Sequence, residues 1–451
     1  MCMKKTLEQP LLDGNYTQAA APDRLSTIAW IKDFLLSEAY HWIQLIYPLQ
    51  SFLQQKLADS TIGDGDDDDD PVNIMILGGG GLRGYAHNGV LQGLLELNDG
   101  DDFLQFFDLA GGTSVGGCCA LLGNHFGVCT REGLQHGEDI LDDVFRTTFL
   151  QKSWQRIFTH GSMSDRKTAL ASVYRRNYGD VPLYKPGNLK AFALAAVKEQ
   201  STSTRTTDSI LSSCNSSVSS PNPYILRTYD VPDMIDDDDD DHDAAKTCTL
   251  PVCAGSSTVR LWEAMAATSA APLLADRIVL HDDDDDEDDD STTTTTTCAD
   301  GGVIANNPFV VGILEALRLW PRRKLGVVVM LTLDGHCPWS IRQAVRMVQK
   351  AYPDTFDFVC LSPPVAVHAL LETQEHRLRE TVRKAKAFTV ASQDAQRVMR
   401  KLKTCRKRCW WSEQSSVELR IQQSDSVVTW GSRHDFCCKQ SPIQLLNQAL
   451  N

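Results

Sequence analysis

Residues 72–81 read VNIMILGGGG, an apolar run that leads directly into four glycines. Such a run followed by glycines is typical of a buried strand that ends in a tight loop. A helical pattern follows at 85–97, residues 103–110 end in a second expected strand, FDLAG, and another helical pattern covers 115–126. Because strands alternate with helices, the sequence predicts an α/β fold with a largely parallel sheet.

The second strand leads into GTSVG, residues 112–116, which places Ser114 in the pattern G-x-S-x-G. This spacing is that of a nucleophile elbow, where a serine stands on a sharp turn between a strand and a helix. The bland alternative is a chance Gly-Ser-Gly turn, but the strand before it and the apolar helix after it meet the context that the motif requires. Ser114 is therefore the candidate nucleophile, and a serine needs a base to activate it.

The glycine loop GGGGLRG, residues 78–84, admits two interpretations. The spacing Gly79-x-Gly81-x-x-Gly84 matches the dinucleotide fingerprint, which expects an acid about 20 residues later at the end of a second strand. The acids near that distance lie in the polar connection before the strand, so this interpretation is incomplete. The alternative is an oxyanion site, in which successive backbone N–H groups bind developing negative charge. The serine elbow favours the second interpretation, because a nucleotide site has no use for it.

The base for Ser114 stays open when the residues are considered alone. In α/β-hydrolases a histidine late in the chain takes this role, and His336 follows an expected strand. A carboxylate can serve instead, and Asp300 begins the stretch DGGVIANNP at 300–308. Asp334 begins a competing Asp-Gly pair.

Four segments, in order along the chain, resemble the elements of the patatin-like phospholipase family: GGGGLRGYAHNGVL (78–91), GTSVG (112–116), WEAMAATSAAP (262–272) and DGGVIANNP (300–308). The resemblance covers about residues 72–335. It implies a patatin-like three-layer fold, with a largely parallel central sheet flanked by helices. It also implies a Ser-Asp dyad without histidine, in which Ser114 is the nucleophile and Asp300 the general base.

The same resemblance assigns roles around the glycine loop. The N–H groups implied to bind the oxyanion are those of Gly79, Gly80 and Gly81. Arg83 is implied to shape or charge the loop, while His87 has a packing or supporting role. No metal or other cofactor is implied. Since a carboxylate base has a low intrinsic pKa, burial is expected to raise the pKa of Asp300 toward the working range.

The chain of 451 residues is long enough for two or three domains. We expect an N-terminal helical extension with an acidic linker over 1–70, a catalytic domain over 71–335 and a mainly helical region over 336–451. The segment 24–58 is expected to be an amphipathic helix that packs on the body rather than spanning a membrane. The alternative is a helix that lies on a membrane surface. The catalytic domain carries low-complexity inserts that are expected to be surface loops: 200–223, 233–247 and 281–297.

The net charge of −15 comes from three acidic runs, at 64–70, 236–241 and 282–290. Without these 21 acids, 38 Asp and Glu remain against 44 Lys and Arg, so the rest of the chain is mildly basic. A homopolymeric Asp run lacks the ligand spacing and turn glycine of a calcium loop. The runs therefore favour solvated loops over a metal site.

Two basic segments lie in the C-terminal region. A basic amphipathic helix is expected near 339–352, and a long helical stretch over about 365–403. The segment 397–411, RVMRKLKTCRKRCWW, has seven Lys or Arg and ends in two tryptophans. This pattern fits a peripheral membrane surface or, equally, a solvated helix whose tryptophans face the core. Nucleic-acid binding is disfavoured, because no nucleic-acid fold motif accompanies the segment.

The sequence thus predicts a lipid acyl hydrolase, of phospholipase A type or a related esterase, that acts on membrane glycerolipids or phospholipids. Acyl transfer or neutral-lipid lipase activity on the same dyad is the first alternative. A catalytically silent membrane scaffold is the second, and a dinucleotide-binding oxidoreductase is a remote third. Fourteen cysteines without a disulfide framework and the lack of a signal peptide pattern favour an intracellular protein, cytoplasmic or peripherally membrane-associated.

Overall fold

The computed structural model describes residues 45–56, 70–127, 134, 169–197, 221–231, 253–271, 277–281, 295–333, 335–364, 375–404, 422–423 and 426–427. Most of the three inserts, the acidic runs, Asp334 and the segment 405–411 lie outside these residues. The structural findings below therefore concern the part of the chain that these ranges cover.

One sheet organises the described residues. Its strands are β1 (Val72–Leu77), β2 (Leu109–Thr113), β3 (Lys190–Val197), β4 (Asn222–Arg227), β5 (Ala254–Ser256), β6 (Ile278–His281), β7 (Thr295–Asp300), β8 (Leu325–Leu331) and β9 (Asp357–Leu361). The main order is β5-β4-β3-β2-β1-β8-β9, and β7 joins β3 while β6 pairs with β7. The strands from β3 through β2, β1 and β8 to β9 are parallel, as the alternation of strands and helices predicts.

The central strands are apolar along their whole length because both faces of the sheet are covered. Every residue of β1, VNIMIL, and of β8, LGVVVML, is buried. The helices that cover the sheet are 45–56, α2 (Gly84–Leu97), α3 (Val115–Phe126), α6 (Ala169–Tyr178), α7 (Leu261–Thr268), α8 (Gly302–Ala305), α9 (Phe309–Leu319), α10 (Trp339–Ala351), α11 (Glu375–Ala391) and α12 (Gln393–Thr404).

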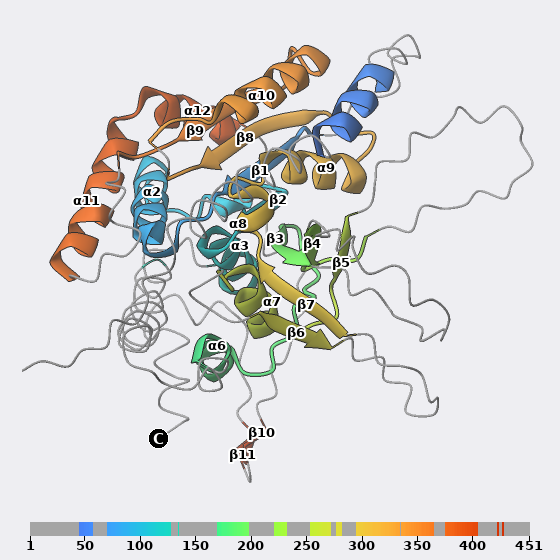
Figure 1. Cartoon of the computed structure of the whole chain (residues 1–451). Helices are drawn as coiled ribbons and strands as arrows, with labels where there is room; N and C mark the ends of the chain where they lie inside the picture. The colour runs from blue at the N-terminus through green and yellow to red at the C-terminus, as the bar shows by residue number, and fades with distance from the viewer. Residues whose placement is uncertain are drawn as a thin grey trace, which may run out of the picture.

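The helices form two layers on opposite faces of the sheet (Figure 1). Met75 and Leu77 of β1 face α2, α11 and α12, whereas Ile74 and Ile76 face α9, α10 and the helix 45–56. Along β3 the same alternation turns Ala193 toward α3, α6 and α7. Helices α2 and α11 lie side by side. The predicted three-layer fold with a largely parallel sheet is confirmed.

The described part of the N-terminal segment is a helix that packs on this body. Leu49 and Leu53 are buried in the same core cluster as Ile74 of β1 and Leu317 of α9. This agrees with the expectation of packing rather than spanning. None of the described helices combines the length and the apolar character that crossing a membrane requires.

Four strands differ from the sequence expectations. The second strand, expected as FDLAG from Phe107, begins at Leu109, after a single 3-10 turn at 104–106 whose Leu104 N–H donates to the Asp102 side chain at 2.9 Å. Two stretches expected to be loops are strand: Asn222 begins β4, and Thr295–Thr297 lie in β7, where β-branched threonines suit a pleated surface. The short strand β9 follows α10 and was not expected; it packs as an edge strand beside β8.

Candidate active site

Ser114 stands between β2 and α3 in a backbone conformation that few residues adopt. Its φ is +54° and its ψ is −129°, a strained geometry for a residue with a side chain. A Cβ atom at residue 116 would overlap the carbonyl oxygen of Leu77, so only glycine lets the turn pass this close to β1. The strand–turn–helix context of a nucleophile elbow is therefore present around Ser114.

Strand pairing brings Asp300 to the same place. β2 runs parallel to β3 and ends with Thr113 opposite Leu194. β7 runs antiparallel to β3 along the same edge, beyond the point where β2 ends. Its last residue, Asp300, lies opposite Ala195, the residue of β3 that follows Leu194. Ser114 and Asp300 are distant in sequence, but both lie where a strand paired with β3 ends. Their common partner β3 therefore brings them together.

The Asp300 carboxyl group is buried, with 5% of the residue exposed, and Ser114 is 7% exposed. Burial raises the pKa of Asp300 to about 6, which confirms the expected direction. Hydrogen bonds from the Gly302 N–H, at 2.7 Å, and from the Ser114 side chain partly offset this rise. The Ser114 side chain therefore lies close enough to the Asp300 carboxyl group to influence its pKa.

The glycine loop passes directly beside the serine. A Cβ atom at residue 79 would lie 3.3 Å from the Cβ of Ser114, so the loop backbone faces the nucleophile. The Gly79 N–H, however, donates to the Asn306 carbonyl at 2.8 Å. This bond differs from the expected oxyanion role of Gly79, because the hydrogen is already used inside the protein. Within the described residues, no hydrogen-bond acceptor is recorded for the N–H groups of Gly80 and Gly81.

The sequence analysis did not identify one further N–H group at this turn, that of Val115. Val115 is the first residue of α3, and the first N–H groups of a helix have no partner within the helix. The residue after an elbow nucleophile is well placed to donate to an oxyanion. The helix N-terminus adds partial positive charge at the same position.

Arg83 shapes the glycine loop through two contacts. Its backbone N–H donates to the Gly80 carbonyl at 3.0 Å, and its guanidinium donates to the Leu333 carbonyl at 3.2 Å. A Cβ atom at residue 80 would overlap the Leu333 side chain, so the residues after β8 press against the loop.

Thr268 connects the nucleophile to the sheet. Its hydroxyl accepts a hydrogen bond from the Ser114 N–H at 3.0 Å and donates to the Leu194 carbonyl at 2.6 Å. Two residues later, the Ala270 carbonyl accepts from the Asp300 N–H at 3.0 Å. The segment WEAMAATSAAP, which the resemblance singled out without a role, therefore holds the backbones of both Ser114 and Asp300.

The residues after Asp300 tie the base to the glycine loop. Asn306 accepts from the Gly79 N–H through its carbonyl, and its side-chain amide donates to the Gly79 carbonyl at 3.4 Å. The Thr113 hydroxyl donates to the Ala305 carbonyl at 2.9 Å, which links the end of β2 to α8. All four segments quoted for the family resemblance therefore converge on Ser114.

The competing histidines do not share this environment. His87 lies in α2 and is fully buried, and burial together with the nearby Arg83 lowers its pKa to about 3. Within the described residues neither ring nitrogen of His87 has a hydrogen-bond partner, so it is a neutral packing residue. His336 is exposed in the residues after β8. The competing Asp334 lies outside the described residues.

The structure does not support the dinucleotide-binding interpretation of the glycine loop, because the acidic residue that this interpretation requires is missing. The fingerprint requires a carboxylate at the end of the second strand, and β2 ends with Thr113 followed by Ser114. Across the described ranges, no cluster of three or more His, Cys, Asp or Glu side chains is arranged to hold a metal ion.

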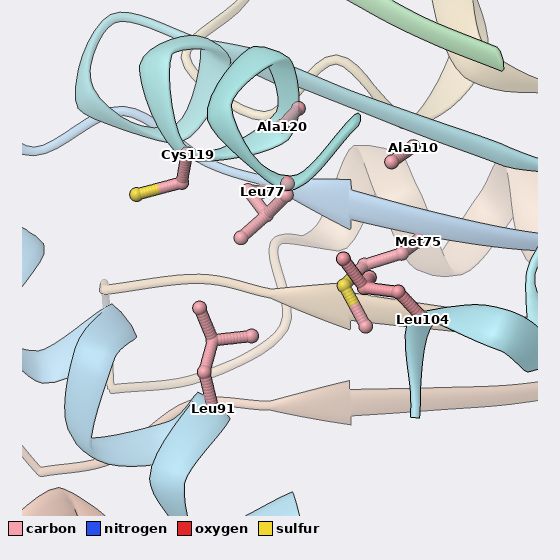
Figure 2. Close-up of a pocket in the computed structure, with 8 residues that line it drawn as sticks. Met75, Leu77, Leu91, Leu104, Ala110, Cys119 and Ala120 are labelled. Carbon is pink, nitrogen blue, oxygen red and sulfur yellow. The ribbon is translucent and has the colours of Figure 1, made fainter. Parts of the chain in front are cut away.

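A small apolar cavity lies between β1, α2 and α3 (Figure 2). Its lining includes Leu77, Leu91, Leu104 and Cys119, and it offers space for about one water molecule. An acyl chain does not fit into such a volume. The cavity is a packing void behind the glycine loop.

The described residues form an α/β fold in which Ser114, at the elbow, and Asp300 are both buried. Comparison with known proteins identifies the family. Residues 75–313 match the family model of patatin-like phospholipases. Because this match covers more than half of the chain, the protein belongs to the patatin-like phospholipase family.

Two curated proteins are similar in sequence. Phospholipase A I of Arabidopsis thaliana is 25% identical over 309 residues, which make up 60% of this chain and 21% of that protein. The cGAMP-activated phospholipase of Vibrio cholerae serotype O1 is 28% identical over 263 residues, or 55% of this chain and 58% of that protein. This chain thus spans less than two thirds of the length of either relative.

Two solved structures also align with the chain. Human GIVD cytosolic phospholipase A2 aligns with a TM-score of 0.37 and 11% identity, over 81% of this chain and 64% of the other. VipD from Legionella pneumophila aligns with a TM-score of 0.33 and 10% identity, over 74% of this chain and 67% of the other.

Proposed function

We propose that this protein is a serine acyl hydrolase that cleaves carboxylic esters of membrane glycerolipids or phospholipids. Family membership and two relatives named as phospholipases support the lipid substrate class. The observation that carries the reaction type is the strained, buried Ser114 beside the buried Asp300, whose pKa the serine side chain influences.

In the first half of the reaction, the Ser114 Oγ attacks the ester carbonyl carbon while Asp300 takes the hydroxyl proton. The carbonyl oxygen becomes an oxyanion that the N–H groups of Gly80, Gly81 and Val115 bind. Each such donor is worth roughly 3–4 kcal/mol to the transition state. Collapse of the tetrahedral intermediate expels the alcohol portion of the lipid, which takes the proton back from Asp300 and leaves an acyl-serine.

In the second half, Asp300 accepts a proton from a water molecule as that water attacks the acyl-serine. The second tetrahedral intermediate collapses, the proton returns to Ser114 and a free fatty acid leaves. A pKa of about 6 suits both roles, because Asp300 is ionised at neutral pH yet basic enough to accept a proton.

Acyl transfer is the second candidate, because an alcohol can replace water at the acyl-serine without any change in the protein groups. A neutral-lipid lipase uses the same steps. Incubation of a labelled lipid with and without glycerol, followed by product analysis, separates a free fatty acid from a transferred acyl group.

The decisive experiment is labelling with a fluorophosphonate probe, which reacts with activated serines. We expect the wild type to be labelled, Ser114→Ala to be unlabelled and Asp300→Asn to be labelled at least a hundredfold more slowly. Asp334→Asn is the matched control and keeps the wild-type rate. A folded wild type that ignores the probe favours a catalytically silent scaffold, and full labelling of Asp300→Asn rejects the dyad.

A further inference from the structure

Helix α10 has one buried face and one exposed, cationic face. Ile341, Ala344 and Val348 are buried against the α9 layer. At a helical period of 3.6 residues, the opposite side carries four exposed residues: Trp339, Arg342, Arg346 and Lys350. We call these four residues the α10 face.

Trp339 is unusual because it lies among cations on the exposed side of an amphipathic helix. It is 67% exposed, the largest exposure among the large apolar side chains of the described residues. A tryptophan left in water loses the benefit of burial, whereas a water–lipid interface suits its amphipathic ring. A lipid surface that covers Trp339 would therefore explain why this side chain is exposed in the protein alone.

The three cations of the α10 face are not neutralised within the described residues. The helix contains no Asp or Glu, and no ion pair of the described chain involves Arg342, Arg346 or Lys350. Their charge is available to an anionic partner.

The basic helix α12 behaves differently, although the sequence pointed there first. Arg397 pairs with Asp357, Lys401 with the same carboxylate at 3.6 Å, and Lys403 with Asp99 at 2.6 Å. Three of the four cations of α12 are thus matched by acids of the protein itself. The available positive charge lies on α10.

The segment that leads into α10 contacts the candidate active site. The residues that lead from β8 into α10 start with Leu333, whose carbonyl accepts from Arg83 and whose side chain contacts Gly80. Trp339 follows six residues later. The start of α10 is therefore joined by a segment of six residues to Leu333, which contacts the glycine loop.

We propose that the α10 face, Trp339 with Arg342, Arg346 and Lys350, docks this protein onto an anionic lipid membrane. The choice of a lipid partner rests on the proposed function, since a lipid ester is presented to its enzyme at an interface. The cations attract acidic head groups, and the indole ring inserts at the level of the head groups. This geometry places the glycine loop and Ser114 near the surface from which the substrate comes.

The test measures co-sedimentation of the full chain with phosphatidylcholine vesicles, with and without phosphatidylserine. We expect binding that requires phosphatidylserine and weakens with added salt. Replacing all three cations by glutamine weakens binding about a hundredfold, at about fivefold per cation. Trp339→Ala weakens binding to phosphatidylserine vesicles at fixed salt and removes a blue shift of tryptophan fluorescence.

The matched control removes the same number of charges from α12, as Arg397→Gln, Lys401→Gln and Lys403→Gln, and retains at least a third of wild-type binding. Fluorophosphonate labelling reports that every variant is folded with its serine intact. Equal loss in both triple variants, or undiminished binding of the α10 variant, overturns the proposal. Binding to a nucleic acid but to neither vesicle also overturns it. If the wild type binds vesicles but does not react with the probe, the proposed hydrolase activity is rejected while the proposed docking face is supported.

Discussion

At the scale of single residues, the Thr268 hydroxyl is the group that holds the nucleophile in its strained conformation. It joins the Ser114 N–H to the Leu194 carbonyl, so both partners lose a bond when the hydroxyl is removed. We expect Thr268→Val, which keeps the shape, to lower kcat about tenfold or more with little change in KM. Thr268→Ser restores the hydroxyl and most of the rate.

The readout for Thr268 is steady-state hydrolysis of a soluble ester, with thermal unfolding as a check of the fold. Leaving a buried N–H without an acceptor costs about 1–3 kcal/mol of stability. If Val and Ser variants are equally slow, the hydroxyl is not the positioning group and only the side-chain volume matters.

The pH dependence of reactivity is a second residue-scale prediction. Asp300 must be ionised to accept a proton, and its pKa is raised to about 6 by burial. Protonation below that value removes the base, so the labelling rate falls about tenfold per pH unit below pH 6 and is flat above pH 7. His336→Ala keeps the inflection in place. An inflection that moves or disappears in that variant identifies the histidine as the base instead.

Sequence reasoning at this scale named Ser114 and Asp300 as candidates. A short motif marks Ser114, whereas Asp300 is preferred to Asp334 and His336 only through the family resemblance. It did not find the role of Thr268, since a hydrogen bond across 154 residues leaves no local pattern. It also could not know that the Gly79 N–H bonds to Asn306, because the use of a backbone donor depends on which segment packs beside it.

At the scale of elements, the elbow turn depends on a glycine that lets α3 approach β1. A methyl group at residue 116 would overlap the carbonyl oxygens of both Leu77 and Gly78. We expect Gly116→Ala to destabilise the fold by about 1–3 kcal/mol and to abolish probe labelling. Gly123→Ala, in the same helix, would meet a single side-chain atom at 3.0 Å and is the control. Equal melting temperatures and labelling for the two variants would contradict this view of the turn.

The elements themselves were largely predictable, and the exceptions have physical causes. Long apolar runs such as β8 and periodic helices such as α10 are strong signals. The strand β9, DFVCL, has only five residues between the turn-forming segments PDT and SPP, so it gives too short an apolar pattern to assign. The expected strand FDLAG begins at Phe107, whereas β2 begins at Leu109, two residues later and after the 3-10 turn at 104–106.

At the scale of the whole molecule, a buried ion pair joins β4 to α9. Arg227 donates to both carboxylate oxygens of Glu315, at 2.7 and 2.9 Å, and the Tyr229 hydroxyl donates to the same group. Removing one partner leaves a buried charge without compensation, so Glu315→Ala is expected to cost about 3–5 kcal/mol in urea unfolding.

The apolar double variant Arg227→Met with Glu315→Leu is the matched comparison for that pair. It removes both charges and is expected to recover most of the lost stability. A double variant that is less stable than Glu315→Ala would show that the pair fixes the packing of α9 in a way that apolar side chains cannot replace.

Because β2 and β7 pair along one edge of β3, the distance between Ser114 and Asp300 in space does not depend on their distance along the chain. Ser114 and Asp300 are 186 positions apart along the chain, yet successive residues of β3 fix how close they lie. The number of residues between them can therefore change during evolution without changing the geometry of the site. Low-complexity tracts can accumulate in that interval, and homologues should differ more in the spacing of the two motifs than in either motif.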